Sequence, residues 1–502
     1  MILGSWYLLI PVLLPVLSGL ALLFVKELDN SSKRNPFTLA VLAVNVLALL
    51  PVLFAQDMEL HLLTLSDSLP IFLHTDAPGK VFATIMGFVW AVAGAYSFEY
   101  MHHEKDHRRY YSLYLITLGV LMALCFAGSI VTFYMFYEAM TLLTFPLVMH
   151  SKKKAAVAAG IKYLIYSVIG ASLVLLGVFI LSPYVNTFAF TAGGVLNMEA
   201  VAGNEGLVLT TVLLMLMGFG AKAGLFPLHG WLPTAHPAAP SPASAVLSGV
   251  ITKAGVLGVI RLMYSYLGAD FLSGSWVQTA YMCMTLLTVF TGSLLAYHEG
   301  HLKKRLAWSS VSQVSYVLFG LSTMNPVGFA GAVLHAIAHS FAKDTLFMSA
   351  GAIIMKTEKT QVADLRGIGK QMPVTMACFT VASLGLVGIP PCMGFISKWY
   401  LAQGSLAASG VNAALNVIGP VVLLISALLT AGYLFPIVIR GFITGNAGHG
   451  HGHDEPAETF TRNDAPLMML IPLLVLAALS VIAGMFPGAL IDLLSKIGTA
   501  LM

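Results

Sequence analysis

The stretch at residues 207–261 constrains the fold most, because lysines and prolines interrupt its apolar sequence. The apolar run 207–220 predicts a membrane-spanning helix, and Lys222 and Pro227 follow it directly. A second apolar run then carries Lys253. A lysine near the middle of a bilayer costs roughly 2.5–3.5 kcal/mol on insertion scales, and a broken helix at that depth must be buried in protein or line a wet cavity. The stretch therefore predicts a helix broken inside the membrane, beside an ion path.

The rest of the chain is also too apolar for a large soluble domain. Of the 502 residues, 58% are hydrophobic and 10% are charged, which indicates an all-α polytopic membrane protein. At about twenty residues per crossing, the apolar runs predict about fourteen spans, near residues 4–25, 37–55, 81–98, 112–129, 131–150, 159–182, 207–226, 243–267, 276–297, 305–322, 327–354, 373–405, 414–439 and 465–489. The run 373–405 is too long for one crossing and contains Pro390 and Pro391, so we expect a second broken helix there.

Positive charge is divided unevenly between alternate loops. Most Lys and Arg residues fall in one set, which holds Lys26, Lys33, Arg34, Lys105, Arg108, Arg109, Lys152, Lys153, Lys154, Lys303, Lys304, Arg305, Lys356, Lys359, Arg366, Lys370, Arg440 and Arg462. The other set holds Lys80 and Lys496. Cytoplasmic loops collect Lys and Arg, so the pattern predicts an even number of spans with both termini outside. The amino terminus has no basic region or cleavage site before Lys26, and we expect it to be retained as the first span.

Motifs for nucleotides, metals and covalent catalysis are missing from the sequence. Its four cysteines, Cys125, Cys283, Cys378 and Cys392, fall in apolar runs without C-x-x-C spacing, which argues against disulfides, zinc and iron–sulfur clusters. No GxGxxG or P-loop pattern occurs. The sequence therefore predicts no catalytic residue, cofactor or metal in this chain. Any iron–sulfur, nickel–iron or flavin group would belong to partner subunits.

The two interrupted helices suggest an internal repeat. Each has a lysine near its break, Lys222 in the first and Lys398 in the second. Each is also the fourth span of a five-span block, and an odd number of spans inverts the second block relative to the first. Paired interrupted helices in inverted repeats indicate a transport site near the midplane. We therefore predict four regions: three helices over 1–110, two half-channels over 111–267 and 276–440, and a His/Gly loop with the last span over 441–502.

Glu138 is the acidic residue expected to pair with Lys222. It lies in an apolar and aromatic run, FYMFYEAMTLLTFPL. A carboxylate and an ammonium about 6 Å apart gain roughly 3 kcal/mol at an effective dielectric near 20. A change of a few ångström in that separation would switch the lysine between holding and releasing a proton. The alternative is a static ion pair that fixes helix packing.

His335, His339 and Lys343 are spaced by four residues, so one helix face would carry all three. Histidine titrates near neutral pH, and successive side chains about 6 Å apart along the axis suit a relay through water. Metal binding is the rival interpretation, but the zincin pattern H-E-x-x-H is absent. Packed core histidines are the other alternative.

Further polar residues extend this series. Lys253 and Lys398 continue it, while His229 and His236 in the Pro-rich segment are candidates for proton uptake or for loop capping. Asp344 is expected either to pair with Lys343 or to face another helix. A third group, Ser309, Ser310, Ser312, Gln313 and Ser315, would hydrate the route or join helices, and Lys162 and Arg261 are expected to reach the interface. The His/Gly tract 449–453 is predicted to be a solvated linker, with metal binding as the alternative.

Five segments, in this order, resemble the antiporter-like subunits shared by respiratory complex I, Mrp-type cation/proton antiporters and membrane-bound hydrogenases. They are FYMFYEAMTLLTFPLV, GFGAKAGLFPLHGWLPTAHPAAPSPASAVLSGVITKAG, LKKRLAWSSVSQVSY, HAIAHSFAKDTLF and GIPPCMGFISKWY. The similarity covers most of residues 80–440. It implies a fourteen-helix fold with inverted repeats and a buried proton path. In that path Glu138 and Lys222 would form the switch, Lys253 the bridge, His335, His339 and Lys343 the second half-channel, and Lys398 the exit.

The resemblance also implies a setting for the chain. We expect a proton-translocating subunit of a multisubunit complex in a prokaryotic cell membrane, working beside further antiporter-like subunits and coupled to redox chemistry on partners. A subunit of an Mrp-type Na⁺/H⁺ antiporter and a structural membrane anchor are the alternatives. The longest members continue into a lateral helix, so a chain ending at Met502 is expected to be one of the shorter members, of the Mrp or hydrogenase type. Some members have glutamate at the position of Lys398.

Overall fold

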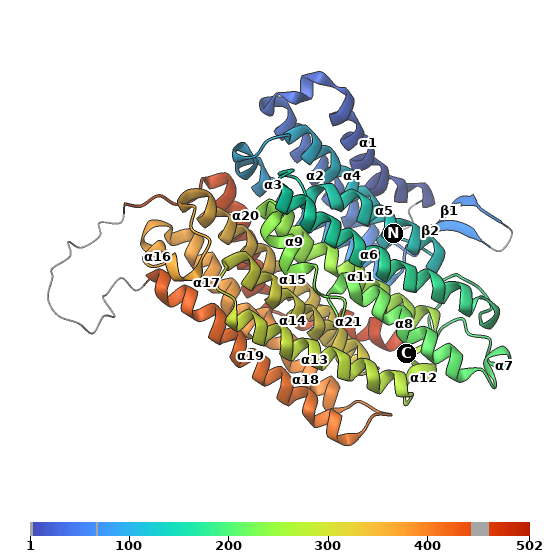
Figure 1. Ribbon diagram of the computed structural model, residues 1–502. Coiled ribbons are helices and arrows are strands. Elements are labelled where there is room, and N and C mark those ends of the chain that lie inside the picture. Colours follow the sequence, from blue (N-terminus) through green and yellow to red (C-terminus); the bar gives the residue numbers. More distant parts are fainter. Residues whose placement is uncertain (1–3, 67–68, 443–460) are drawn as a thin grey trace.

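The computed structural model describes residues 4–66, 69–442 and 461–502 and consists mainly of long helices packed side by side (Figure 1). Within these ranges, ten helices are long and apolar enough to cross a membrane. The all-α membrane fold predicted from composition is thus confirmed, whereas the count of fourteen spans stays a prediction. The His/Gly tract 449–453 lies outside the described residues.

The first half of the bundle follows the predicted spans closely. Its helices are α1 (Leu9–Phe24), α2 (Ser31–Phe54), α3 (Ala77–Tyr100), α4 (His107–Cys125), α5 (Ile130–Val148), α6 (Lys154–Leu181), α8 (Glu205–Ala223), α9 (Leu232–Ala238), α10 (Ser241–Val246) and α11 (Thr252–Ile260), with short 3₁₀ turns η1 (Ser5–Leu8), η2 (Lys26–Asp29), η3 (Met101–His103) and η4 (Ser182–Tyr184). Side-chain caps begin several of them: Asp76 accepts from Gly79 N–H at 3.0 Å, and Ser129 from Thr132 N–H at 3.0 Å. The Ser129 cap separates α4 from α5, because a capped helix start requires non-helical backbone before it.

The second half has the same sequence of long elements. They are α13 (Trp276–His298), α14 (Leu302–Ser322), α15 (Pro326–Thr357), α17 (Pro373–Val387), α18 (Met393–Leu406), α19 (Ala413–Phe442), α20 (Leu467–Met485) and α21 (Gly488–Leu501), with short pieces α7 (Met198–Val201), α12 (Ala269–Leu272), α16 (Ile368–Gln371) and η7 (Val362–Asp364) elsewhere in the chain. The long helix α15 starts at Pro326, after Asn325 accepts a hydrogen bond from Gly328 N–H at 2.8 Å.

Both predicted helix breaks are present, and they have the same backbone design. Helix α8 ends at Gly224 with φ 91°, and α17 ends at Gly388 with φ 93°. A left-handed residue at this position favours glycine. In each case the next two amides bond back to a carbonyl of the last turn: Gly224 and Leu225 N–H to Gly220 O, and Gly388 and Ile389 N–H to Leu384 O. The glycines, and not the prolines alone, therefore set where each helix stops.

The innermost helices carry most of the charged residues singled out by the sequence. The segment Ser241–Tyr266 is buried along its most apolar stretch, and α15 is buried from Gly328 to Ile353. This segment contains two π-helical turns, η5 (Leu247–Ile251) and η6 (Arg261–Tyr266), which the periodicity did not predict. Extra residues in such turns shift the side chains that follow, and π turns occur often at functional sites.

Two peripheral elements were also unpredicted. Strands β1 (Glu59–Thr64) and β2 (Pro70–His74) pair antiparallel, and α21 is a C-terminal amphipathic helix that packs on the start of α15. Figure 1 shows the hairpin, α7 and α12 at one end of the bundle and α16 towards the other. Loops of the lysine-rich set bond to one another at that other end, since His150 contacts Lys105 O and Gly367 N–H donates to Arg440 O.

Candidate functional site

The ammonium of Lys222 is held in the interior beside aromatic rings. Lys222 lies in the last turn of α8 and is 1% exposed. Its Nζ donates to Thr141 Oγ1 and, at 3.4 Å, to the Tyr163 hydroxyl, and it lies 4.8 Å from the centre of the Tyr137 ring. Hydroxyl acceptors and a cation–π contact compensate the ammonium for lost water. The lysine therefore faces protein and not lipid.

Glu138 is close to Lys222 but is not its hydrogen-bond partner. It lies on α5, half-buried, and Oε1 has no hydrogen-bond partner among the described residues. The two side chains interact electrostatically, yet no ion pair joins them within the described parts of the chain. Thr141, one turn further along α5, takes the position in which direct pairing was expected. The expectation of a contact pair is therefore corrected to a separated pair.

Lys253 and His339 form the central contact between the two halves. Nζ of Lys253 lies 2.5 Å from Nδ1 of His339 and donates to Ser248 O at 2.8 Å. Both side chains are buried. Nδ1 must be the acceptor when Lys253 is charged, so this contact is a ready path for a proton between lysine and imidazole.

His335 links α15 to the second broken helix. One ring nitrogen lies 2.9 Å from Ser397 Oγ on α18, and the other lies 3.1 Å from Gln313 Oε1 on α14. Its ring stacks on Tyr316 at 5.2 Å, and Nζ of Lys398 lies 5.0 Å from the centre of the same ring. Lys398 donates to Leu386 O at 2.7 Å and Val387 O at 2.9 Å, the carbonyls left free where α17 stops.

Lys343 branches away from this line. Its Nζ donates to Leu306 O at 2.8 Å and to Ser309 Oγ, both on α14. Asp344, the next residue, does not pair with it but faces Gly249 of η5. The expected straight relay over His335, His339 and Lys343 is therefore a line through His339 and His335 with Lys343 to one side.

The polar residues of α14 divide between the two roles considered for them. Ser309 and Gln313 contact Lys343 and His335, whereas Ser312 bonds to Ser293 on α13 at 2.8 Å and Ser426 on α19 at 3.3 Å. Ser310 bonds to Ser248 at 2.7 Å. Ser309 and Gln313 belong to the charged series, and Ser312 joins helices.

His236 and His229 lie between the break and the lysine-rich end. His236 is completely buried, stacks on Phe347 at 4.6 Å, and neither of its ring nitrogens has a hydrogen-bond partner within the described ranges. Its ring therefore does not cap the loop. His229 is less buried and contacts the rings of Phe226 and Trp308 at 5.8 and 5.7 Å.

A polar cavity of about 290 Å³ opens at the lysine-rich end, which the sequence did not predict. Glu104, Lys153, His301 and Lys303 are among its lining residues. Burial raises the pKa of the Glu104 carboxyl, and the charges of Lys303 and Lys153 oppose that change. Lys303 is itself buried and donates to Ala239 O at 2.7 Å. A second cavity, of about 250 Å³, is lined by Gly388, Lys398 and Trp399.

Arg261 corrects an expectation, because it does not reach the interface. It is 1% exposed and forms a two-pronged ion pair with Asp76, with Nη2 2.8 Å from Oδ1. This pair ties η6 to the start of α3. Lys162, also expected at the interface, donates to Thr234 Oγ1 on α9 at 3.1 Å. An acid at a helix cap was the only signal in the sequence for the Asp76 pair.

Comparison with known proteins agrees with this geometry. Residues 127–425 match the family described as NADH:quinone oxidoreductase/Mrp antiporter, transmembrane. The chain is 31% identical to NADH-quinone oxidoreductase subunit N of Desulforudis audaxviator over 81% of its length and 80% of that protein. It is 31% identical to hydrogenase-4 component B of Escherichia coli over 86% of its length, but spans 63% of that protein.

A solved structure shares the whole fold. The Mrp complex from Dietzia contains a chain that superposes with a TM-score of 0.85 at 20% identity, covering 100% of this chain and 98% of that one. At this identity the likeness concerns the fold. The family match covers more than half of the residues, and it includes both Glu138 and Lys398. The chain therefore belongs to the NADH:quinone oxidoreductase/Mrp antiporter transmembrane family.

Proposed function

We propose that this chain is a proton-translocating, antiporter-like subunit of a multisubunit energy-converting membrane complex. The observation that supports it most directly is the series of buried basic residues that crosses the bundle on α8, α11, α15 and α18. Ionisable residues inside a membrane protein are rare, and they mark ion pathways. The lysines and histidines of this series are held by neutral acceptors or by one another.

The proposed path runs from Glu138 and Lys222 to Lys253, then through His339 and His335 to Lys398. Protons would reach it from the cavity near Glu104 and Lys303 by way of His236. A charge arriving at Lys222 repels a charge at Lys253, so occupancy of one lysine changes the proton affinity of the next. In this scheme residues 111–267 and 276–440 are the two half-channels.

Partner subunits would supply the driving reaction. We place the chain in a prokaryotic cell membrane with both termini outside, next to further antiporter-like subunits and to subunits that carry redox centres. An Mrp-type Na⁺/H⁺ antiporter without redox chemistry is the second candidate, favoured by the superposition on a chain of the Mrp complex. A structural anchor is the third.

The decisive experiment is substitution of Glu138 in the assembled complex. Glu138→Gln keeps the shape and removes the charge that favours protonated Lys222, so proton uptake into proteoliposomes should fall at least tenfold. A loss of roughly 3 kcal/mol, the attraction of such a pair at about 6 Å, would correspond to more than tenfold. Glu138→Asp should be milder because it keeps the charge.

The exposed residue Glu199 provides the matched control. Glu199→Gln should leave proton uptake unchanged. Equal uptake by the wild type and Glu138→Gln would make Glu138 a packing residue. Proton uptake that needs Na⁺ on the other side, with no redox subunit in the purified complex, would favour the Mrp-type alternative.

A further inference from the structure

Asp344 is a buried acid for which the proposed path has no role. It lies on α15, is completely buried, and neither carboxyl oxygen has a hydrogen-bond partner among the described residues. A buried carboxylate without donors is costly unless a positive charge lies near it. Such a group is therefore either uncharged or balanced by a cation.

The π-helical turn η5 makes room for this carboxyl group. A Cβ on Gly249 would overlap Oδ1 of Asp344, so only glycine fits there. One turn earlier on α15, Ser340 donates to Gly249 O at 2.6 Å. These two contacts hold η5 against α15 with Asp344 enclosed between them.

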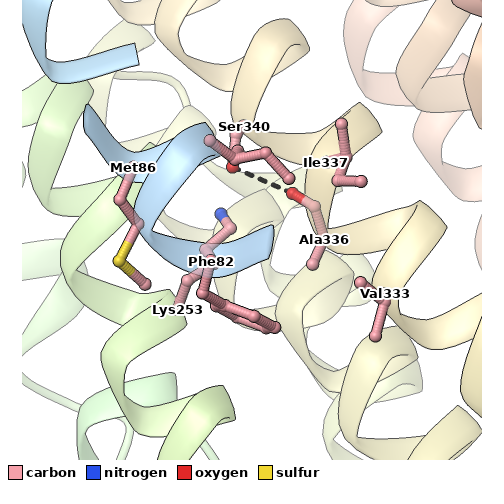
Figure 2. Close-up of a pocket in the computed structure, with 8 residues that line it drawn as sticks. Phe82, Met86, Lys253, Val333, Ala336, Ile337 and Ser340 are labelled. Carbon is pink, nitrogen blue, oxygen red and sulfur yellow. Dashed lines mark hydrogen bonds between the residues drawn. The ribbon is translucent and has the colours of Figure 1, made fainter. Parts of the chain in front are cut away.

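Lys253 is the cation that reaches the same turn. Its Nζ donates to the carbonyl of Ser248, the neighbour of Gly249, at 2.8 Å. Lys253 and Ser340 line one small cavity between α3, α11 and α15 (Figure 2). Lys253 interacts electrostatically with Asp344, and among the described groups it is the only cation that does so appreciably.

The other ionisable groups nearby are occupied elsewhere. Lys343 points to α14, as shown by its bonds to Leu306 O and Ser309 Oγ. Tyr114 of α4 interacts with Asp344 electrostatically, but its hydroxyl donates to Trp90 O at 2.6 Å. Lys253 is thus the natural proton partner of Asp344.

We propose that Asp344 is the acidic partner of Lys253 and stores a proton beside the central step of the path. The Nζ–H bond of the ammonium breaks as an Oδ–H bond forms, which converts an ion pair into two neutral groups with no change in total charge. Reversal returns the proton to Lys253. A neutral Lys253 no longer repels charge at His339, so this store would clear the centre for the next proton. The inference rests on the proposed function, in which Lys253 carries protons.

Infrared spectroscopy of the purified complex tests the pair without relying on transport. Difference spectra between acidic and alkaline buffer should contain a carboxylic C=O band that is lost in Asp344→Asn. In Lys253→Met, where Asp344 is intact, that band should stop responding to pH, because the acid stays protonated. Asp492→Asn, at an exposed position on α21, is the control and should leave the spectrum unchanged.

Proton uptake by the same proteins completes the test. Asp344→Asn should lower uptake at least tenfold, while Asp492→Asn should not. A band that persists in Asp344→Asn, or that titrates normally in Lys253→Met, would overturn the inference even if Glu138→Gln blocks uptake. If Asp344→Asn fails to assemble, the Lys253→Met spectrum decides. Absence of uptake by the wild type would instead refute the proposed function, and the spectra would still judge the pair.

Discussion

At the scale of residues, the buried lysines are mostly held by neutral oxygen atoms. Lys222 contacts hydroxyls, Lys343 contacts a carbonyl and a hydroxyl, and Lys398 contacts two carbonyls. Neutral acceptors stabilise an ammonium by roughly 1.5–3 kcal/mol each without cancelling its charge. A proton can therefore leave such a lysine without first breaking an ion pair. Arg261, whose proton does not leave, has a carboxylate partner instead.

His339 is the residue whose removal should interrupt the path most cleanly. His339→Ala deletes the ring that contacts Lys253, and proton uptake by the reconstituted complex should fall by roughly 10²-fold, the lower end of what a positioned proton-transfer group contributes. His102→Ala, in an exposed 3₁₀ turn, is the control. Normal uptake by an assembled His339→Ala complex would exclude a relay on α15.

At the scale of elements, the helix breaks and the loops between helices decide where these residues lie. The glycine stops of α8 and α17 are the same device used twice, and each leaves carbonyls or a lysine at the break. At the lysine-rich end, His150 joins the loop before α4 to the loop after α5. These local structures can be tested separately.

Substituting the two stop glycines should displace the lysines beside them. Gly224→Ala and Gly388→Ala force a side chain into left-handed backbone, at about 1–3 kcal/mol each, and the new Cβ at Gly388 would lie 2.9 Å from Cδ of Lys398. Thermal stability and proton uptake should both fall. Gly206→Ala, where the Cβ meets no other atom within 4 Å, is the control. Wild-type uptake by both variants would show that the breaks need no glycine.

The His150 contact should make stability depend on pH. Burial lowers the pKa of His150 to about 4, and the Arg109 guanidinium adds to this. The unfolded imidazole titrates near 6.5, so between these values the unfolded chain binds more protons. The free energy of unfolding should therefore fall as the pH drops from 6.5 towards 4. Melting curves of His150→Gln should show a smaller drop over this range. An equal drop in both proteins would assign the effect to other groups.

At the scale of the whole molecule, the fold places polar groups at its centre and apolar groups on its outside. Exposed large hydrophobic side chains lie along α1, α2, α6 and α19, whereas α15 and the segment from α10 to η6 are enclosed. This arrangement is suited to lipid or partner subunits around a polar interior. The loops at the two ends also differ in charge, which determines orientation.

Cysteine labelling should establish that orientation. A single cysteine replacing the exposed Lys152 should react with an impermeant maleimide only from the cytoplasmic side, and one replacing Thr499 on α21 only from outside. The native cysteines would first be changed to serine or alanine. Labelling of both positions from one side would refute the predicted topology.

The sequence by itself determined the membrane class, the family, both helix breaks and the basic residues of the proposed path. These features depend on local composition, on glycine and proline, and on the high energy of burying charge in lipid. Only the tertiary structure decided which charges meet. It separated Glu138 from Lys222 by way of Thr141, sent Lys343 to α14, paired Arg261 with Asp76, and turned Asp344 towards η5. Such contacts join residues far apart in the chain, and the π-helical turns shift side chains away from the regular 3.6-residue spacing on which sequence patterns depend.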